Sequence, residues 1–313
     1  MAGGGSGSSV PESCFENLPK LVDDLDVYLR AYQAYAEFSG LKVDIYRKWA
    51  RGILDEQVVK PLADAFPTDQ TTLLRVLAVG SGDGKIDSCI LEQLVARYSR
   101  IEYTVIEPAE EPMREFQALV QEREADFGKV DFVWCNETFD DYRRRQTADS
   151  QPGFHLVHAI HSLYYVDDLR QGVEFLQEKL VRSGVLCVIL LSEEAGIYRV
   201  WDRYPKLVEG SPAHNLCSSH LITLYKESNI PYSFYRQSWP SDISLCFDPT
   251  SAKGNGMLDF ISHVPNFRQS APPALRDDLL AFLKNLNRSV KDDEGSSGGY
   301  PRDWDSIVMI KSK

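Results

Sequence analysis

Between residues 73 and 192 the chain alternates short apolar runs with longer amphipathic segments. The apolar runs are rich in Val, Ile and Leu, as is typical of strands buried on both faces of a sheet. They are LLRVLAVG (73–80), IEYTVIEP (101–108), VDFVWCNET (130–138), HLVHAIHSLYYV (155–166) and GVLCVILLS (184–192). The segments between them, such as IDSCILEQLVARY, PMREFQALVQERE and LRQGVEFLQEKLV, have helical spacing. This alternation predicts an α/β fold with a doubly wound, largely parallel sheet.

The regions on either side follow other patterns. Residues 1–16 are rich in Gly and Ser and predict a disordered tail, whereas 17–65 carry aromatic residues at helical spacing. Residues 66–192 form the α/β core. From 193 to 313 the pattern changes to helix and loop segments, followed by the strand candidates YSFYRQSW (232–239), DISLCF (242–247) and SIVMIKS (306–312). We therefore expect this last region to add auxiliary structure and the final strands of the sheet.

The first strand of the core ends in a glycine turn. Gly80, Gly82 and Gly84 give the pattern G-x-G-x-G, which lets a ligand approach the backbone closely. Dinucleotides need a third glycine where this chain has Lys85, whereas S-adenosylmethionine suits the observed spacing. Glu107, at the end of the second strand, is suited to accept hydrogen bonds from ribose hydroxyls. The turn and the acid together predict a nucleoside cofactor.

Composition narrows the range of partners. Acidic residues outnumber basic ones by 46 to 34, so nucleic acid is not an expected partner, and a cationic small molecule suits the surface better. The longest apolar run, 184–191, is too short to cross a bilayer, so no membrane partner is expected. The six cysteines are scattered singly, which argues against a metal site or disulfides and for a cytoplasmic protein with reduced thiols.

A set of separate motifs along the chain resembles the histamine N-methyltransferase family. The motifs are VLAVGSGDGKID (76–87), VIEPAEE, ETFDDY (137–142), LYYV (163–166), DISLCF and the final SIVMI, and the likeness runs from about Tyr28 to the C-terminus. The resemblance implies a seven-stranded Rossmann-like, S-adenosylmethionine-dependent methyltransferase with an added substrate-binding region. It also implies a cytoplasmic monomer without a metal, in which 17–65 covers the substrate and 193–313 adds to its binding region.

The resemblance also implies which residues hold the cofactor. Gly80, Gly82 and Gly84 would contact its methionine part and Glu107 its ribose, while Thr138 and Phe139 would lie on the adenine side. Ile160 would pack under the cofactor. Two positions depart from the family pattern. Pro112 stands where the family has a glutamine and Phe139 where it has a serine. Both changes remove polar contacts with the adenosine.

The substrate side follows from the same resemblance. His161 occupies the position of a family glutamine that contacts the acceptor ring, and a histidine can either orient that ring or accept its proton. Leu41 replaces a glutamate that neutralises the amine of histamine, which leaves Asp44 or Asp303 as the substitute acid. For Arg302 a solvated loop position is expected, and a pairing with a substrate carboxylate is the alternative. The predicted aromatic walls are Tyr28, Tyr32, Tyr35, Tyr164, Tyr165 and Trp201.

The sequence therefore predicts an S-adenosylmethionine-dependent N-methyltransferase for an imidazole ring nitrogen, with carnosine as substrate and anserine as product. Histamine or another small amine is the alternative substrate. A dinucleotide-dependent oxidoreductase is disfavoured by Lys85, and a non-catalytic binding protein on the same scaffold remains an alternative because substrate and adenine positions are altered. The ring nitrogen that is methylated and the role of His161 as base or orienting group stay open.

Overall fold

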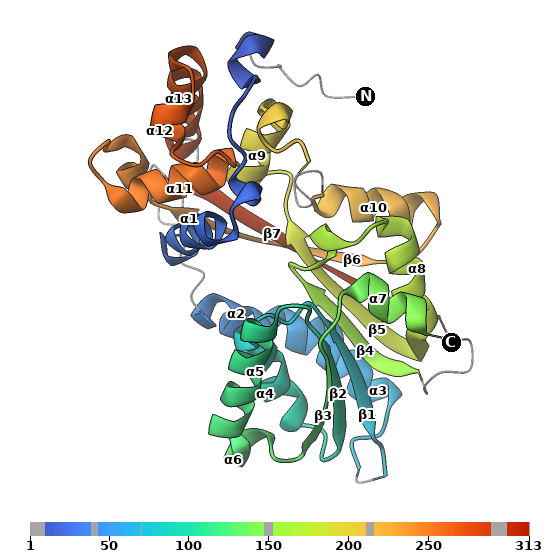
Figure 1. Cartoon of the computed structure of the whole chain (residues 1–313). Helices are drawn as coiled ribbons and strands as arrows, with labels where there is room; N and C mark the ends of the chain where they lie inside the picture. Colours follow the sequence, from blue (N-terminus) through green and yellow to red (C-terminus); the bar gives the residue numbers. More distant parts are fainter. Residues whose placement is uncertain are drawn as a thin grey trace. The chain divides into compact units, whose positions relative to one another are not determined.

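The fold is built on one seven-stranded sheet, seen in a computed structural model that describes residues 10–38, 43–69, 71–146, 153–210, 216–288 and 299–312 (Figure 1). The strand order is β3-β2-β1-β4-β5-β7-β6. The strands are β1 (Leu74–Val79), β2 (Ile101–Ile106), β3 (Val130–Cys135), β4 (Phe154–Ile160), β5 (Leu180–Leu191), β6 (Ser233–Ser241) and β7 (Tyr300–Ile310). The expected α/β fold with a doubly wound sheet is confirmed.

The strand register explains how the sheet is wound. Strands β3, β2, β1, β4 and β5 are parallel to their neighbours, with Val76 opposite Tyr103 and Ala78 opposite His158. The pairing of β5 with β7 differs: the Ser183 N–H donates to the Lys311 carbonyl and the Ser192 N–H to the Asp303 carbonyl, so β7 runs antiparallel to β5. The chain winds outward from β1 in one direction and from β4 in the other. The carboxyl ends of β1 and β4 therefore border the switch point of the sheet, where open α/β sheets bind ligands.

Two compact units divide the chain. The sheet unit takes the described residues of Lys42–Leu190, Ser218–Tyr235 and Asp305–Lys313, and the helical unit those of Met1–Leu41, Leu191–Cys217 and Arg236–Trp304. Each unit is made of three separate segments of the sequence, so the units do not coincide with the four consecutive segments 1–16, 17–65, 66–192 and 193–313. The functional roles expected for those four segments remain predictions.

Helices cover the sheet within the sheet unit, with α4 and α5 on one side of the strands and α7 and α8 on the other (Figure 1). Local chemistry sets their starts: the Asp168 side chain accepts from the Gln171 N–H (2.9 Å) at the beginning of α8. The helices are α2 (Val43–Trp49), α3 (Lys60–Ala65), α4 (Lys85–Val95), α5 (Glu110–Glu122), α6 (Glu124–Phe127), α7 (Phe139–Arg145), α8 (Leu169–Lys179) and α10 (Ser218–Glu227), with a π-helical stretch η3 (Ala50–Val59) and a 3-10 turn η4 (Leu163–Tyr165).

The helical unit has a core of its own, which includes the buried Val200, Leu258 and Leu279. Its helices are α1 (Leu25–Phe38), α9 (Gly196–Arg203), α11 (Ala252–Ser262), α12 (Phe267–Ser270) and α13 (Pro273–Arg288), with 3-10 turns η1 (Glu12–Phe15), η2 (Leu21–Asp23), η5 (Pro205–Leu207) and η6 (Ser244–Phe247). Among the residues described, no helix has the length and apolarity to span a membrane.

Two sequence-based expectations need correction here. DISLCF does not form a strand: it contains η6, because the Asp242 side chain accepts from the Ser244 N–H (2.8 Å) and turns the chain. The expected tail 1–16 contains the turn η1, so the ordered chain begins before residue 17; residues 1–9 lie outside those the structure describes.

Candidate functional site

The glycine turn follows β1 and is held by packing on two sides. All three glycines have positive φ, from 56° to 73°. A Cβ on Gly80 would come within 2.4 Å of the Ser162 Cβ, and one on Gly84 within 2.0 Å of the Phe116 ring. A Cβ on Gly82 would meet nothing within 4 Å. Gly80 and Gly84 are therefore needed for close packing, whereas Gly82 borders open space that a ligand can occupy.

Glu107 faces this turn from the end of β2. Its Oε2 accepts from the Gly82 N–H at 2.8 Å and its Oε1 from the Ala109 N–H at 3.0 Å, and the residue is only 8% exposed. An acid fixed beside an open glycine backbone fits the ribose end of a nucleoside cofactor. The pairing of glycine turn and acid expected from the sequence is present.

Local structure also places the three other residues expected to hold the cofactor. The Thr138 hydroxyl accepts from the Asp141 N–H (3.1 Å) and donates to its carboxylate (2.7 Å), so Thr138 caps α7. Phe139 is buried with its ring edge-on to Phe175 at 5.8 Å, and Ile160 is buried at the end of β4. All three follow or end a parallel strand at the same edge of the sheet. Their contact with the cofactor stays a prediction.

His161 immediately follows β4 and has a left-handed backbone, with φ of 53°. Its N–H donates to the Ile189 carbonyl at 2.9 Å, and its Nδ1 lies 3.2 Å from the Tyr164 hydroxyl. The rings of His161 and Tyr164 are nearly parallel, with centroids 6.3 Å apart. A left-handed non-glycine residue costs about 1 kcal/mol or more, and such strain concentrates at functional sites.

Ser162, the residue after His161, links His161 to the glycine turn. The Ser162 hydroxyl donates to the Val79 carbonyl at 2.6 Å, at the point where β1 enters the turn. The same side chain is the one that a Cβ on Gly80 would strike. The two turns at the switch point of the sheet are thus packed against each other, and no larger residue at position 80 is compatible with this arrangement.

The predicted aromatic residues divide between the two units. Tyr164 is buried in the sheet unit, whereas Tyr165 is 59% exposed. In the helical unit, the rings of Tyr28, Tyr32 and Tyr35 gather around Phe260 at centroid distances of 5.9, 5.5 and 4.8 Å. Trp201 is buried in the core of that unit and donates to the Ile261 carbonyl at 2.9 Å.

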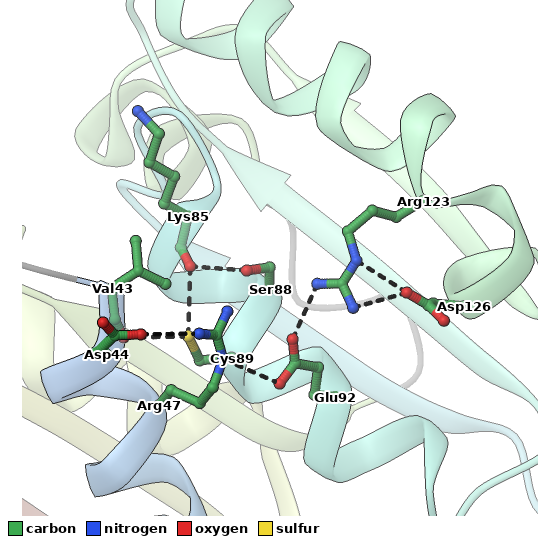
Figure 2. Close-up of polar contacts among 9 residues, drawn as sticks. All are labelled: Val43, Asp44, Arg47, Lys85, Ser88, Cys89, Glu92, Arg123 and Asp126. Atoms are coloured by element: carbon green, nitrogen blue, oxygen red, sulfur yellow. Dashed lines mark hydrogen bonds and ion pairs between the residues drawn. The ribbon is translucent and has the colours of Figure 1, made fainter.

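The charged candidates differ in environment. The Arg302 guanidinium lies over the Tyr35 ring at 5.3 Å and is 8% exposed, and Asp303 is buried beside it in β7. Asp44 is 79% exposed and paired with Arg47 at 3.0 Å (Figure 2), so it is an exposed surface acid. Leu41 lies outside the described residues.

Three contacts made by the candidate residues and their neighbours were not expected from the sequence. In the helical unit, one is the contact of the tyrosines with Phe260, which the pairing of α1 with α11 brings to them. Another is Tyr46 on α2, whose ring meets His161 edge-on at 6.2 Å. The third is the buried Asp87, which accepts from the Ser81 and Tyr103 hydroxyls. The sequence signal for Asp87 was its place in the first turn of the helix after the glycines.

The helix α2 that carries Tyr46 is attached to α4 by a chain of ion pairs (Figure 2). Arg47 lies 3.7 Å from the Glu92 carboxylate, which also pairs with Arg123 at 3.0 Å. The Cys89 thiol lies 3.9 Å from the Val43 carbonyl at the start of α2. These contacts fix α2 to the helix that follows the glycine turn.

Metal ligands do not gather at this site: among the residues described, no three His, Cys, Asp or Glu side chains are placed to hold an ion.

Comparison with known proteins shows which curated proteins the chain is similar to. No family model matches the chain. It is 29% identical to the mouse (Mus musculus) histamine N-methyltransferase over 70% of this chain and 75% of that protein. It is 27% identical to the Bos taurus enzyme, covering 70% and 76%. For the Danio rerio enzyme the identity is 25%, covering 87% and 92%.

Among solved structures, the plantazolicin methyltransferase BpumL in complex with SAH aligns with a TM-score of 0.45 and 12% identity, over 96% of this chain and 93% of that one. Likeness at that level carries no weight for function. The sequence similarity bears out the resemblance expected from the motifs, and the seven-stranded sheet bears out the expected fold. The chain is similar to histamine N-methyltransferases over most of its length, and it is a methyltransferase that uses S-adenosylmethionine.

Proposed function

We propose that this enzyme methylates an imidazole ring nitrogen of a small molecule, with carnosine as substrate and anserine as product. Histamine is the alternative substrate. The observation that carries the proposal is His161 at the switch point of the sheet, packed through Ser162 against the glycine turn. This arrangement supports an acceptor ring held next to the cofactor.

On this proposal the glycine turn and Glu107 hold the cofactor. The open backbone at Gly82 would receive its methionine part, and Glu107 would accept hydrogen bonds from its ribose hydroxyls. Thr138 and Phe139 would lie on the adenine side, and Ile160 would pack under the cofactor. The cofactor supplies a methyl group on a positively charged sulfur, ready for transfer to a nucleophile.

The acceptor needs little activation, because a neutral imidazole nitrogen already carries a lone pair. The cofactor would supply its methyl group to that nitrogen and leave as a neutral thioether, and the methylated ring would carry a positive charge and one N–H proton. His161 would hold that N–H by a hydrogen bond and so direct the other nitrogen toward the methyl group. The proton then leaves to His161 or to water. Tyr164 and Tyr46 would fix the orientation of the His161 ring.

The preference for carnosine rests on the charged residues. By the family resemblance, Leu41 replaces the acid that would neutralise the ammonium of histamine. An unpaired buried ammonium is costly, so histamine is expected to bind poorly. Carnosine has a more distant amine and a carboxylate as well. The buried Asp303 and Arg302 offer charges of both signs for these groups.

A methyl-transfer assay with radiolabelled S-adenosylmethionine would test the proposal. Carnosine, histamine, histidine and an aromatic amine are compared at equal concentrations, and products are identified by mass spectrometry. We expect ring-methylated carnosine with the highest kcat/KM. Transfer to none of the four would contradict the proposal. In parallel, S-adenosylhomocysteine but not NAD should raise the melting temperature, which separates this class from dinucleotide-dependent enzymes.

A further inference from the structure

A buried chain of hydrogen bonds runs beneath the glycine turn. The Ser81 hydroxyl, between Gly80 and Gly82, donates to the Asp87 Oδ1 at 3.0 Å. The Tyr103 hydroxyl lies 2.8 Å from the same oxygen and 2.7 Å from the His158 Nε2. Asp87, Tyr103 and His158 are all almost fully buried. The chain therefore joins the turn to α4, β2 and β4.

Two arrangements of protons fit these positions. If Asp87 is ionised, Ser81 and Tyr103 both donate to its carboxylate, and the His158 Nε2–H donates to Tyr103. If Asp87 is protonated, its O–H donates to the Tyr103 oxygen and Tyr103 donates to the His158 Nε2. Ser81 donates to a charged acceptor in the first case and to a neutral one in the second. A charge-assisted hydrogen bond is about twice as strong as a neutral one.

We propose that Asp87 is a positioning residue for the cofactor: its ionised carboxylate, through the Ser81 hydroxyl, holds the glycine turn in the form that binds S-adenosylmethionine. This inference rests on the proposed use of the glycine turn for cofactor binding. Ser81 is the link because its backbone lies in the turn and its side chain reaches the buried acid. The Gly84 N–H also donates to the Ser81 carbonyl at 3.1 Å, so an anchored Ser81 restrains both sides of Gly82.

The surroundings place the ionisation of Asp87 near neutral pH. Burial raises the pKa of Asp87 to about 7, and the hydrogen bonds from Tyr103 and Ser81 oppose that rise. The nearby acid Asp83 also raises it and is itself paired with Lys85 at 2.6 Å. The pKa of His158 is lowered by burial to about 3, so it is neutral above acidic pH.

The helices packed on α4 bring further charges, but these are paired farther along the helix. Arg47 of α2 and Arg123, at the junction of α5 and α6, both lie against Glu92 (Figure 2). Asp55 of η3 pairs with Arg97 at 2.8 Å. We therefore attribute any pH response of the glycine turn to the ionisation of Asp87. The titratable groups around Asp87 are Asp83, Tyr103 and His158.

Calorimetric binding of S-adenosylhomocysteine at pH 6 and pH 8, at constant ionic strength, tests the inference. The variants are Asp87→Asn, which reproduces the protonated carboxyl, and Ser81→Ala, which removes the link without touching the buried acid. Asp305→Asn is the matched control, because Asp305 is also fully buried and also accepts from a serine, Ser218, at 2.5 Å. Thermal melts check that each variant is folded.

We expect wild type and Asp305→Asn to bind about three- to tenfold more tightly at pH 8 than at pH 6. Asp87→Asn and Ser81→Ala should bind at both pH values with about the affinity of wild type at pH 6. If the affinity for S-adenosylhomocysteine changed equally with pH in wild type, Asp87→Asn and Ser81→Ala, the inference about Asp87 would be wrong, but the proposed cofactor site would stand. If wild type bound no S-adenosylhomocysteine at either pH, both the proposed cofactor site and this inference would be wrong.

Discussion

The Tyr46 ring meets the His161 ring edge-on, at a centroid distance of 6.2 Å and an interplanar angle of 85°. Tyr164 lies against the same histidine in a nearly parallel orientation. The imidazole is thus contacted by two aromatic rings in two directions, which restricts its rotation. A ring that must present one nitrogen to an acceptor benefits from such restriction.

Replacing His161 should therefore affect turnover more than cofactor binding. His161→Ala is expected to lower kcat at least tenfold and leave the affinity for S-adenosylhomocysteine within about threefold, because only the acceptor loses its contact. His161→Gln restores the group that the family resemblance places here and should keep much of the activity. The measurements are steady-state kinetics and calorimetric binding. A folded but inactive Gln variant would favour a role for His161 as base.

Glu107→Ala should weaken cofactor binding strongly. The variant loses the carboxylate that accepts from the Gly82 N–H and that would accept from the ribose. The loss is expected to be about 2–4 kcal/mol, roughly 30- to 1000-fold in Kd. Calorimetry with S-adenosylhomocysteine measures it, with Glu102→Ala on the same strand as the control. Wild-type affinity in the Glu107 variant would refute this placement of the ribose.

The pH dependence of stability should differ between wild type and Asp87→Asn. The pKa of Asp87 is about 7 in the folded protein and ordinarily 3.8. The stabilisation of the folded state by the protonated Asp87 is therefore fully present below about pH 4 and is lost as the pH rises to 7. His158 acts in the opposite direction: its lowered pKa gives stability that is present above pH 6.5 and lost as pH falls toward 3.

Urea unfolding from pH 4.5 to 7.5 separates the two effects. Asp87→Asn removes the penalty of ionising a buried acid, so its stability relative to wild type should rise with pH across this range. The full shift corresponds to a change on the order of 4 kcal/mol. A difference that stays constant with pH would show that Asp87 does not titrate in this interval.

Substrate preference should change when the charge at position 41 or at position 303 is changed. Leu41→Glu is expected to improve kcat/KM for histamine by about ten- to hundredfold, since it supplies a partner for the ammonium. Asp303→Ala should reduce kcat/KM for carnosine more than for histamine. Asp44→Ala is the control, because that acid is exposed and paired with Arg47. Wild type that already prefers histamine, unchanged by Leu41→Glu, would leave carnosine without support.

The core of the sheet could be predicted from sequence because its strands are marked by short apolar runs, which are a local pattern. The sequence also assigned Glu107 and the glycine turn to one cofactor site, and the two lie together because parallel strands end at a common edge. The tyrosines of α1 were expected to line up at helical spacing, but their contact with Phe260 was not, because Phe260 reaches α1 only through long-range packing. The chain of Asp87, Tyr103 and His158 likewise depends on strand register across β2, β1 and β4. DISLCF misled because its apolar residues alternate while Asp242 turns the backbone.

The left-handed backbone at His161 sets folding and catalysis against each other at a single residue. Glycine or asparagine would adopt that conformation with less strain, yet neither carries an imidazole. A library randomised at this codon and sorted for thermal stability alone should therefore enrich Gly and Asn. The same library sorted for methyl transfer should retain His or Gln. Persistence of histidine here would then reflect selection for chemistry, maintained against the preference of the fold.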